Sequence, residues 1–351
     1  MKNGSSVRKN WFMLIIGFAL FFLGGSIVHA EKYKVEISGL WAGTNPYSVA
    51  VAWAKLINDN SKTVEAIARE GRGPNVDMKS IIKDPEKGKH LVFFLVEDSV
   101  WGASEGFAGW KRFKGKYNFD DFRHLSLIGF TSDVLLTLDP AIKTMKDLNG
   151  RSVVISNVSA TSAKAVGFKK TFELGGVKPK YEYLGMKAMV GSLRDGLVDV
   201  VHGGINVLGP GKFAPSPYLR ELFATKKVYP VSLNKKAVLE MKKETGHPGS
   251  VVTFPPKAID QYQSGPVVAL GKCMTWGAHT DMPDEVAAEI LRIYLANIDS
   301  FGEVTPGAKI LDKKTIAAIG VPKKRYHPGA VQFYENNGVK MTSLQDLGII
   351  D

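Results

Sequence analysis

Two loops near the start of the chain carry residue types suited to binding an anion. Residues 39–47 read Gly-Leu-Trp-Ala-Gly-Thr-Asn-Pro-Tyr, and Thr44 or Asn45 is placed to cap a helix whose free N–H groups face the space above the preceding strand. Residues 69–82 repeat this arrangement around a Gly-Pro turn, and the guanidinium of Arg72 matches the geometry of a carboxylate. Both loops indicate a site for a carboxylate or a similar oxyanion. The alternative is structural, with Thr44 as a plain cap and Arg72 in solvent.

Three further polar clusters follow apolar, strand-like runs. They begin at Glu97, Asn157 and His202. Because ligands of open α/β sheets bind outside the carboxyl ends of the strands, we expect these clusters and the two loops to line one site. Trp101 and Trp276 are candidates for stacking on a flat ligand, with core packing as the alternative. The residues predicted to bind the ligand are Trp41, Gly43, Thr44, Tyr47, Arg72, Asn75, Glu97, Asp98, Trp101, Ser159, Ala160, Thr161, Gly203, Gly204 and Asn206.

The sequence offers little for catalysis. It contains no Gly-x-Ser-x-Gly elbow, no His-Glu-x-x-His motif and no Walker-type phosphate loop, and its seven histidines lack metal-ligand spacing. Cys273 lies in an apolar run and is interpreted as a small buried hydrophobe. We therefore predict no catalytic residue, no metal and no cofactor. If the protein were an enzyme, Asp98 with His202 would be the acid–base pair to consider.

The N-terminus has the pattern of a cleavable signal peptide. The first ten residues hold three basic side chains and no acidic one, residues 11–23 are apolar, and Val-His-Ala at 28–30 ends the segment. The apolar core is shorter than the roughly 20 residues that span a bilayer. We therefore expect cleavage near Ala30 and a periplasmic mature protein, with a retained membrane anchor as the alternative.

Composition narrows the class further. Cys273 is the only cysteine, so the chain has neither an internal disulfide nor a lipid-modified N-terminal cysteine. Removing residues 1–30 lowers the net charge from +12 to +9, since the segment carries three basic residues and no acids. The remaining basic residues are scattered along the chain, which argues against a nucleic-acid partner. We expect a soluble monomer with a mild attraction for small anions.

Strand-like and helix-like patterns alternate along the mature chain, which predicts an α/β fold. The segment at 33–38 alternates apolar and polar residues, and a helical pattern at 47–57 follows it. Further strands are expected at 91–96, 125–130, 134–138, 151–156, 181–184, 198–201 and 267–276, and further helices at 142–150, 162–174, 187–194 and 283–298.

About 320 mature residues exceed the usual size of one domain, so two lobes are expected. We place the boundaries near Pro140 and between Ser264 and Leu270. Lobe I then comprises residues 31–140 plus 266–351, and lobe II comprises residues 141–265. The two α/β lobes would be joined at a hinge by crossing strands, with the ligand cleft between them.

The whole mature chain resembles the TAXI group of TRAP-transporter solute receptors. The segments that carry the resemblance, in order, are the Gly-x-x-x-Gly-Thr loop with Tyr47, Gly73-Pro74-Asn75, Glu97-Asp98, the segment 147–153 (Asp-Leu-Asn-Gly-Arg-Ser-Val), Ser159-Ala160-Thr161, the segment 193–200 (Leu-Arg-Asp-Gly-Leu-Val-Asp-Val), and the segment 327–335 (His-Pro-Gly-Ala-Val-Gln-Phe-Tyr-Glu). The last segment is the most specific.

The resemblance implies a two-lobed periplasmic-binding-protein fold of the type II kind. Known members bind a small organic anion, an amino acid or a dicarboxylate, between lobes that close by hinge bending, and then dock on TRAP-type membrane permease subunits. Two loops depart from the family pattern. Leu40, Trp41, Asn45 and Pro46 interrupt the first loop, and Asn157, Val158 and Ala160 stand in for glycines of the second. These bulkier loops leave an aromatic or larger acid open as the ligand.

Two alternatives to uptake stay open. One is a ligand-sensing subunit that reports to a membrane sensor kinase, and the other is a periplasmic enzyme on the same fold. Product turnover would identify the enzyme. Genes for TRAP-type membrane subunits beside this one would favour uptake, and a sensor kinase there would favour sensing.

Overall fold

The described strands form one mixed sheet of 11 strands in the computed structural model, which describes residues 31–107, 109–156 and 162–350. The predicted signal peptide at 1–30 lies outside the described residues. The strand order is β2-β1-β3-β11-β4-β7-β5-β6, with β10 beside β11, β8 beside β7 and β9 beside β4. The strands are β1 Tyr33–Ser38, β2 Val64–Arg69, β3 Leu91–Leu95, β4 Phe122–Thr137, β5 Ser152–Ser156, β6 Lys180–Tyr183, β7 Val200–Gly209, β8 Lys212–Pro215, β9 Tyr229–Val231, β10 Ser250–Phe254 and β11 Val267–His279.

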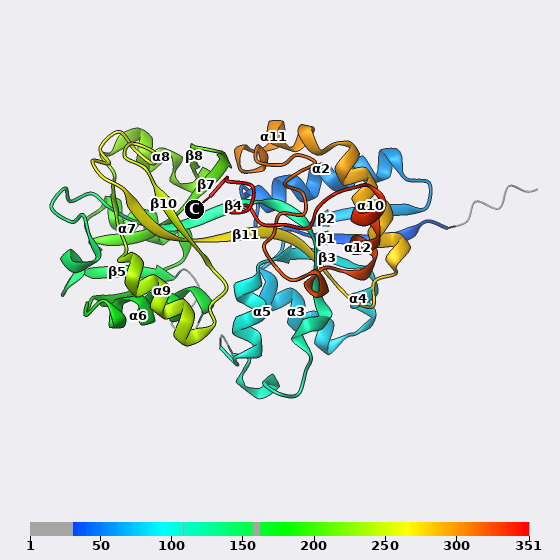
Figure 1. Cartoon of the computed structure of the whole chain (residues 1–351), viewed down its shortest axis with the longest axis horizontal. Coiled ribbons are helices and arrows are strands. Elements are labelled where there is room, and N and C mark those ends of the chain that lie inside the picture. Colours follow the sequence, from blue (N-terminus) through cyan, green and yellow to red (C-terminus); the bar gives the residue numbers. More distant parts are fainter. Residues whose placement is uncertain (1–30, 108, 157–161, 351) are drawn as a thin grey trace, which may run out of the picture. The chain divides into compact units, whose positions relative to one another are not determined.

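The helices divide into two groups on either side of β4 and β11. We call β1–β3 with the helices around them the first half, and β5–β10 with theirs the second half (Figure 1). Helices of the first half are α2 Asn45–Asn60, α3 Pro74–Lys83, α4 Glu86–His90, α5 Glu97–Ser104, α10 Asp284–Ala296, α11 Phe301–Val304 and α12 Pro328–Asn336. Helices of the second half are α6 Ala163–Leu174, α7 Met186–Arg194, α8 Arg220–Thr225 and α9 Lys235–Thr245. No helix in these described ranges is long and apolar enough to cross a membrane.

Strands β4 and β11 connect the two halves. They are 16 and 13 residues long and pair antiparallel, with Asp133 opposite Leu270 and Thr131 opposite Lys272. The prediction of two separate strands at 125–130 and 134–138 is wrong, because Ser132 and Asp133 continue the ladder instead of forming a turn. Polar residues in the middle of β4 therefore belong to a buried strand.

Other predicted elements agree with the structure to different degrees. The strand at 33–38 is β1 as predicted, and the helix predicted at 162–174 is α6, for which the Ser162 hydroxyl accepts a hydrogen bond from the Ala165 N–H. The helix predicted at 142–150 is wrong. Only a 3-10 turn forms at Met145–Leu148, which begins with a capping box at Thr144 and is followed by Gly150 in the left-handed region.

The strand predicted at 198–201 is too short. Strand β7 runs to Gly209, so Gly203, Gly204 and Asn206 lie within the strand and not in a loop after it. Close packing explains why glycines occupy positions 203 and 204 of this strand. A Cβ atom on Gly203 would lie 2.4 Å from Leu136 Cδ1, and one on Gly204 would lie 2.6 Å from Ser216 Oγ.

A buried aromatic cluster packs helix α2 against α10 and β11 of the C-terminal segment. Trp53 packs against Tyr294 and Trp276, with ring centroids 4.8 and 5.5 Å apart, and its indole N–H donates to the Ile290 carbonyl. The Tyr294 hydroxyl donates to the Leu127 carbonyl at 3.0 Å. Trp276 is fully buried here, so core packing is its role and stacking on a ligand is not.

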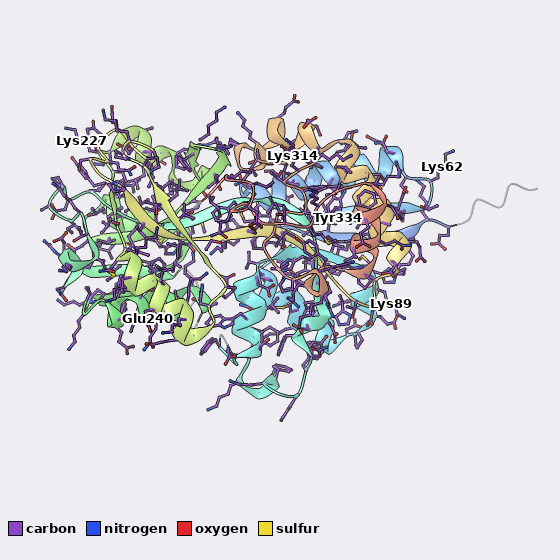
Figure 2. All side chains as sticks on the ribbon, in the orientation of Figure 1. Lys62, Lys89, Lys227, Glu240, Lys314 and Tyr334 are labelled. Carbon is purple, nitrogen blue, oxygen red and sulfur yellow. The ribbon has the colours of Figure 1, made fainter. Side chains whose placement is uncertain are left out.

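The basic surface is dispersed. The exposed side chains of Lys62, Lys89, Lys227 and Lys314 lie at widely separated places in Figure 2, while Tyr334 is fully buried and its hydroxyl donates to the Leu125 carbonyl at 2.7 Å. These four lysines therefore do not belong to one basic patch.

Substituting Tyr294→Phe should lower the free energy of unfolding by about 1 kcal/mol, because the buried Leu127 carbonyl loses a hydrogen bond and the ring packing is kept. Urea denaturation measures this loss. The matched control is Tyr262→Phe, whose ring is 37% exposed, and it should change stability by less than about 0.5 kcal/mol. Equal stability of the two variants would contradict the role given to Tyr294.

Candidate ligand-binding site

A cavity of about 330 Å³ opens beside the two connecting strands and is lined by both halves of the molecule. The first half contributes the 40–46 loop, the start of α3 and the start of α5, and the second half contributes the starts of α6 and α7, strand β7 and residues 216–218. Of the predicted ligand residues, those that line it are Trp41, Gly43, Thr44, Arg72, Asn75, Asp98, Gly204 and Asn206. The structure therefore brings these eight together from four separate segments.

Helix N-termini surround this cavity. Asn45 of α2, Pro74 of α3, Ala163 of α6 and Met186 of α7 all line it and stand at the first position of their helices. The first turns of α2, α6 and α7 contain no acidic residue. Their free N–H groups and the positive ends of the helix dipoles favour an anion in the cavity.

The floor of the cavity is a buried cluster of charges. Asp133 of β4 accepts Lys164 Nζ on one carboxylate oxygen and Lys272 Nζ on the other, both at 2.8 Å. Lys164 begins α6, and Lys272 lies on β11, where its Nζ is also 4.0 Å from Asp98 Oδ2. The Asp133 side chain is 10% exposed, and those of the two lysines 17% and 19%. One carboxylate thus holds both connecting strands and the start of α6 together.

The environment sets the charges of this cluster. Burial opposes ionisation of Asp133, but the ammonium groups of Lys164 and Lys272 outweigh it and lower the pKa of Asp133. Burial lowers the pKa of Lys272 less than Asp133 and Asp98 raise it, so this lysine is held charged. Burial, followed by the charge of Lys164, lowers the pKa of His202 well below its ordinary value, which leaves the imidazole neutral.

The pKa of Lys164 is shifted in the opposite direction from that of Lys272. Burial, together with the charge of Lys272, lowers the pKa of Lys164 in spite of the Asp133 carboxylate, and its Nζ also lies 3.3 Å from His202 Nδ1. A negative group brought near Lys164 would counter this shift.

Hydrogen bonds across the cavity join α2 to β7. The Asn45 side-chain amide donates to Asn206 Oδ1 at 3.3 Å, and the Thr305 hydroxyl donates to Asn45 Oδ1. The Tyr218 hydroxyl accepts the Gly204 N–H at 2.8 Å. These polar side chains form a fixed rim next to the charged floor.

Sequence reasoning missed Asp133, Lys164, Lys272 and Tyr218. A signal for two of them was present, because Asp133 and Lys272 are single charges of opposite sign inside long apolar runs. A buried charge requires a partner, so such a pair indicates strands that lie side by side. Lys164 and Tyr218 had no comparable signal, since a lysine or a tyrosine near a helix start is ordinary.

Two predicted residues line the cavity in a different way from that expected. Thr44 occupies the N-cap position of α2 but makes no capping hydrogen bond, and its hydroxyl donates to the Trp41 carbonyl at 2.7 Å. The capping role given to Thr44 is therefore wrong. Asn75 accepts a hydrogen bond from the Trp110 indole N–H at 2.8 Å, which fixes its side chain beside the start of α3. Arg72 is exposed, as is Trp41 at 38%.

Trp101, Tyr47 and Gly203 do not line the cavity. The Trp101 indole N–H donates to the Thr245 carbonyl at 3.2 Å, and its ring packs edge-on against His247 at 4.9 Å. Trp101 thus joins α5 of the first half to the end of α9 in the second. Ser159, Ala160 and Thr161 lie outside the described residues.

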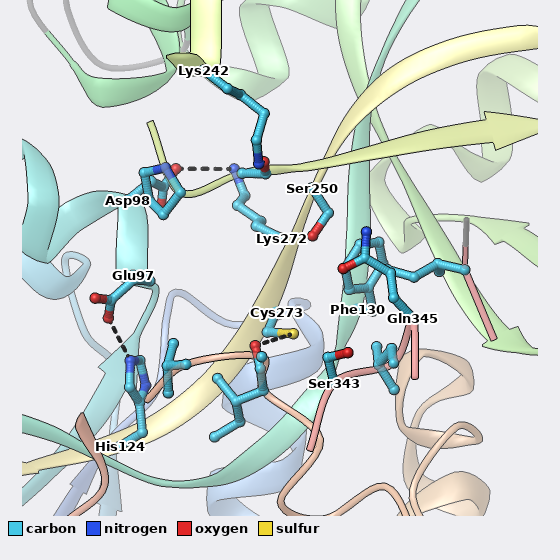
Figure 3. A pocket seen from close by; sticks show the side chains of 17 residues that line it. Glu97, Asp98, His124, Phe130, Lys242, Ser250, Lys272, Cys273, Ser343 and Gln345 are labelled. Carbon is cyan, nitrogen blue, oxygen red and sulfur yellow. Dashed lines mark hydrogen bonds and ion pairs between the residues drawn. The ribbon is translucent and has the colours of Figure 1, made fainter. Parts of the chain in front are cut away.

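Glu97 faces a second, smaller cavity of about 210 Å³, shown in Figure 3. Its carboxylate pairs with Arg325, both contacts at 3.1 Å, and accepts His124 Nε2 at 2.7 Å. Burial alone would raise the pKa of Glu97. The hydrogen bond and charge of His124 and the charge of Arg325 outweigh burial and lower this pKa to about 2. The Cys273 thiol donates to the Ile319 carbonyl in the same cavity, and burial raises its pKa to about 12. Glu97 therefore serves a structural ion pair.

The nominated acid–base pair, Asp98 with His202, is not assembled in the part of the chain that the structure describes. Asp98 pairs with Lys272, whereas His202 contacts Lys164 and lies 4.0 Å from Asp133, so the two candidate acid–base residues have different partners. Among the described residues, no three His, Cys, Asp or Glu side chains are grouped to hold a metal ion.

The fold is the two-lobed α/β fold seen in solved binding-protein structures. MatC from Rhodopseudomonas palustris, with bound malate, matches with a TM-score of 0.50 and 14% identity over 87% of this chain and 96% of that chain. An R. palustris protein with adipate gives a TM-score of 0.48, 15% identity and coverage of 77% and 85%. A TctC solute-binding protein from Polaromonas gives 0.46, 12%, 79% and 88%. The fold assignment rests on MatC.

The chain belongs to the NMT1-like family, which matches residues 41–338. The matched range covers the cavity loops, both connecting strands and most of the C-terminal segment. No curated protein matches the chain in sequence.

Stability should fall as the pH drops from about 4.5 towards about 2, because the folded state holds Glu97 ionised below its ordinary pKa. A group with a lowered folded pKa contributes stability above its unfolded pKa and loses it as the pH falls through the folded pKa. Glu97→Gln should lower the free energy of unfolding by about 3 kcal/mol at pH 7 and by little at pH 2.

Urea denaturation between pH 2 and pH 7 measures this difference. The control is Glu303→Gln, an exposed carboxylate that should leave the curve parallel to that of the parent protein. A Glu97→Gln curve that also runs parallel to it would contradict the ion-pair account of Glu97.

Proposed function

We propose that the protein is an extracytoplasmic solute-binding protein that captures a small organic anion, such as a carboxylate, amino acid or aromatic acid. The observation that carries the proposal is the cavity at β4 and β11, where helix starts from both halves meet a floor containing Lys164 and Lys272. A ligand held this way contacts both halves at once. Such a ligand stabilises whichever arrangement of the halves brings its contacts together.

The lobes of this proposal are residues 31–140 plus 266–351 and residues 141–265, with the hinge at the connecting strands. The end of β4 at Thr137 and the start of β11 at Val267 lie next to these boundaries and support them. The lobes would close around the ligand by bending at these strands.

The location and partners follow from the same proposal. Residues 1–30 act as a signal peptide cleaved near Ala30, and the mature protein works in the periplasm as a monomer without catalysis or a cofactor. It delivers its ligand to membrane permease subunits. The TAXI-like segments support a TRAP-type system, and the dispersed basic surface gives no support to a nucleic-acid partner.

Lys164→Met should weaken binding of a carboxylate ligand about tenfold or more, because a charge-assisted hydrogen bond contributes roughly 1.5–3 kcal/mol. The experiment is a thermal-shift screen of carboxylates, amino acids and aromatic acids, followed by calorimetric titration of the best compound. Lys236→Met, at an exposed position on α9, is the matched control and should bind as the parent protein does.

Two outcomes would count against the proposal. A broad screen without any stabilising acid would argue against a role in capturing organic anions, because a ligand raises the melting temperature by mass action. Unchanged affinity in a folded Lys164→Met variant would show that the ligand does not bind in this cavity.

A further inference from the structure

The cavity beside β4 and β11 has a large apolar wall in addition to its charged floor. This wall comprises Leu40, Trp41, Phe94, Val96, Met186 and Met274. It is built by both halves, since Trp41 lies in the first loop and Met186 begins α7. Apolar surface of this kind is covered at lowest cost by an apolar part of a ligand. The occupant thus has a hydrophobic body.

The charges around the cavity balance almost completely. Its lining holds three cations, Arg72, Lys164 and Lys272, and two carboxylates, Asp98 and Asp133. Asp133 makes one contact with each lysine, and the Lys272 ammonium also faces Asp98, so the two carboxylates offset two of the three positive charges while the ammonium groups keep N–H donors for a ligand. The pKa of His202 is lowered, so this imidazole adds no charge.

One positive charge of the lining is then not offset by a carboxylate of the lining. Arg72 lines the cavity and makes no ion pair with any described residue, and residues 157–161, Asn-Val-Ser-Ala-Thr, contain no charged side chain. The unmatched formal charge of the lining is therefore +1. It is balanced by a ligand with a single negative group.

A second carboxylate on the ligand would meet an unfavourable environment. No further unmatched cation lines the described cavity, and both Asp98 and Asp133 would repel it. The helix starts do not reverse this balance. Those of α3 and α5 already carry acids in their first turns, Asp77 on α3 and both Glu97 and Asp98 on α5, and the starts of α2, α6 and α7 offer partial dipole charges but no further unit positive charge.

We infer that the cavity selects monocarboxylates with an apolar body, aromatic or aliphatic, over dicarboxylates of the same length. The inference rests on the proposed function and narrows its ligand class. It separates this chain from MatC, whose structure holds the dicarboxylate malate.

Calorimetric titration of the purified protein with two matched pairs of acids tests the inference. The pairs are hexanoate with adipate and 4-methylbenzoate with terephthalate, and within each pair a methyl group of the first acid stands where the second acid has its second carboxylate. The monocarboxylate should bind at least about tenfold more tightly in the pair whose body fits, because the added charge is left unmatched.

The possible results separate the two proposals. Equal or tighter binding of the dicarboxylate overturns the inference and leaves the capture of an organic anion intact. Binding of amino acids or hydroxy acids alone, with neither pair bound, also overturns it. Failure of every acid in the thermal-shift screen overturns the proposed function, and the inference with it.

Asp98→Asn provides a second test in the same protein. The variant keeps the shape of the side chain and adds one unit of positive charge to the lining, so the preference for hexanoate over adipate should fall at least about fivefold. Asp299→Asn, an exposed aspartate outside this cavity, should keep the preference of the parent protein. An unchanged preference in a folded Asp98→Asn variant would contradict the charge balance, and the two acid pairs decide the matter alone if the variant does not fold.

Discussion

The Asp133 carboxylate, held between two lysines from separate elements, constrains the whole centre of the molecule. Taking a carboxylate and two ammonium groups out of water is unfavourable unless each finds its partner in good geometry. Both lysines reach Asp133 at 2.8 Å, and they come from β11 and from the start of α6. The register of the two connecting strands and the position of α6 must therefore be set together. The site is a consequence of that constraint.

The alternation of side chains along β4 and β11 gives the two faces of these strands different roles. Thr131 and Asp133 on β4, with Met274 on β11, line the larger cavity, while Phe130 and Cys273 line the smaller one on the other face. Lys272 borders both cavities, as Figure 3 shows for the smaller one. Bending of these strands would therefore change both cavities at once, and a ligand in the larger one acts directly on the connection between the halves.

Sequence patterns predicted the parts of the fold that depend on local periodicity. Strand β1 and helix α6 follow from alternation and from a Ser162 cap, and loops at strand ends located much of the cavity. The extended β7 was not foreseen, because glycines at 203 and 204 indicate a turn locally but are required here for close packing with Leu136 and Ser216. Trp101 was assigned to the ligand, although its partner lies at residue 245, a contact that only the tertiary fold creates. Lys164 was missed for the same reason, whereas Asp133 and Lys272 carried a signal in the sequence that was not used.

A double-mutant cycle on Asp133 and Lys164, measured by urea denaturation, tests this constraint most directly. Asp133→Asn, Lys164→Met and the double variant should each fold, and the loss in the double variant should be smaller than the sum of the single losses. A coupling of about 2 kcal/mol is expected, because Asp133→Asn leaves the Lys164 ammonium without its carboxylate and Lys164→Met removes one of the two cations that offset the Asp133 charge. Additive losses, with a coupling near zero, would contradict the claim that this buried ion pair holds the connecting strand to the start of α6.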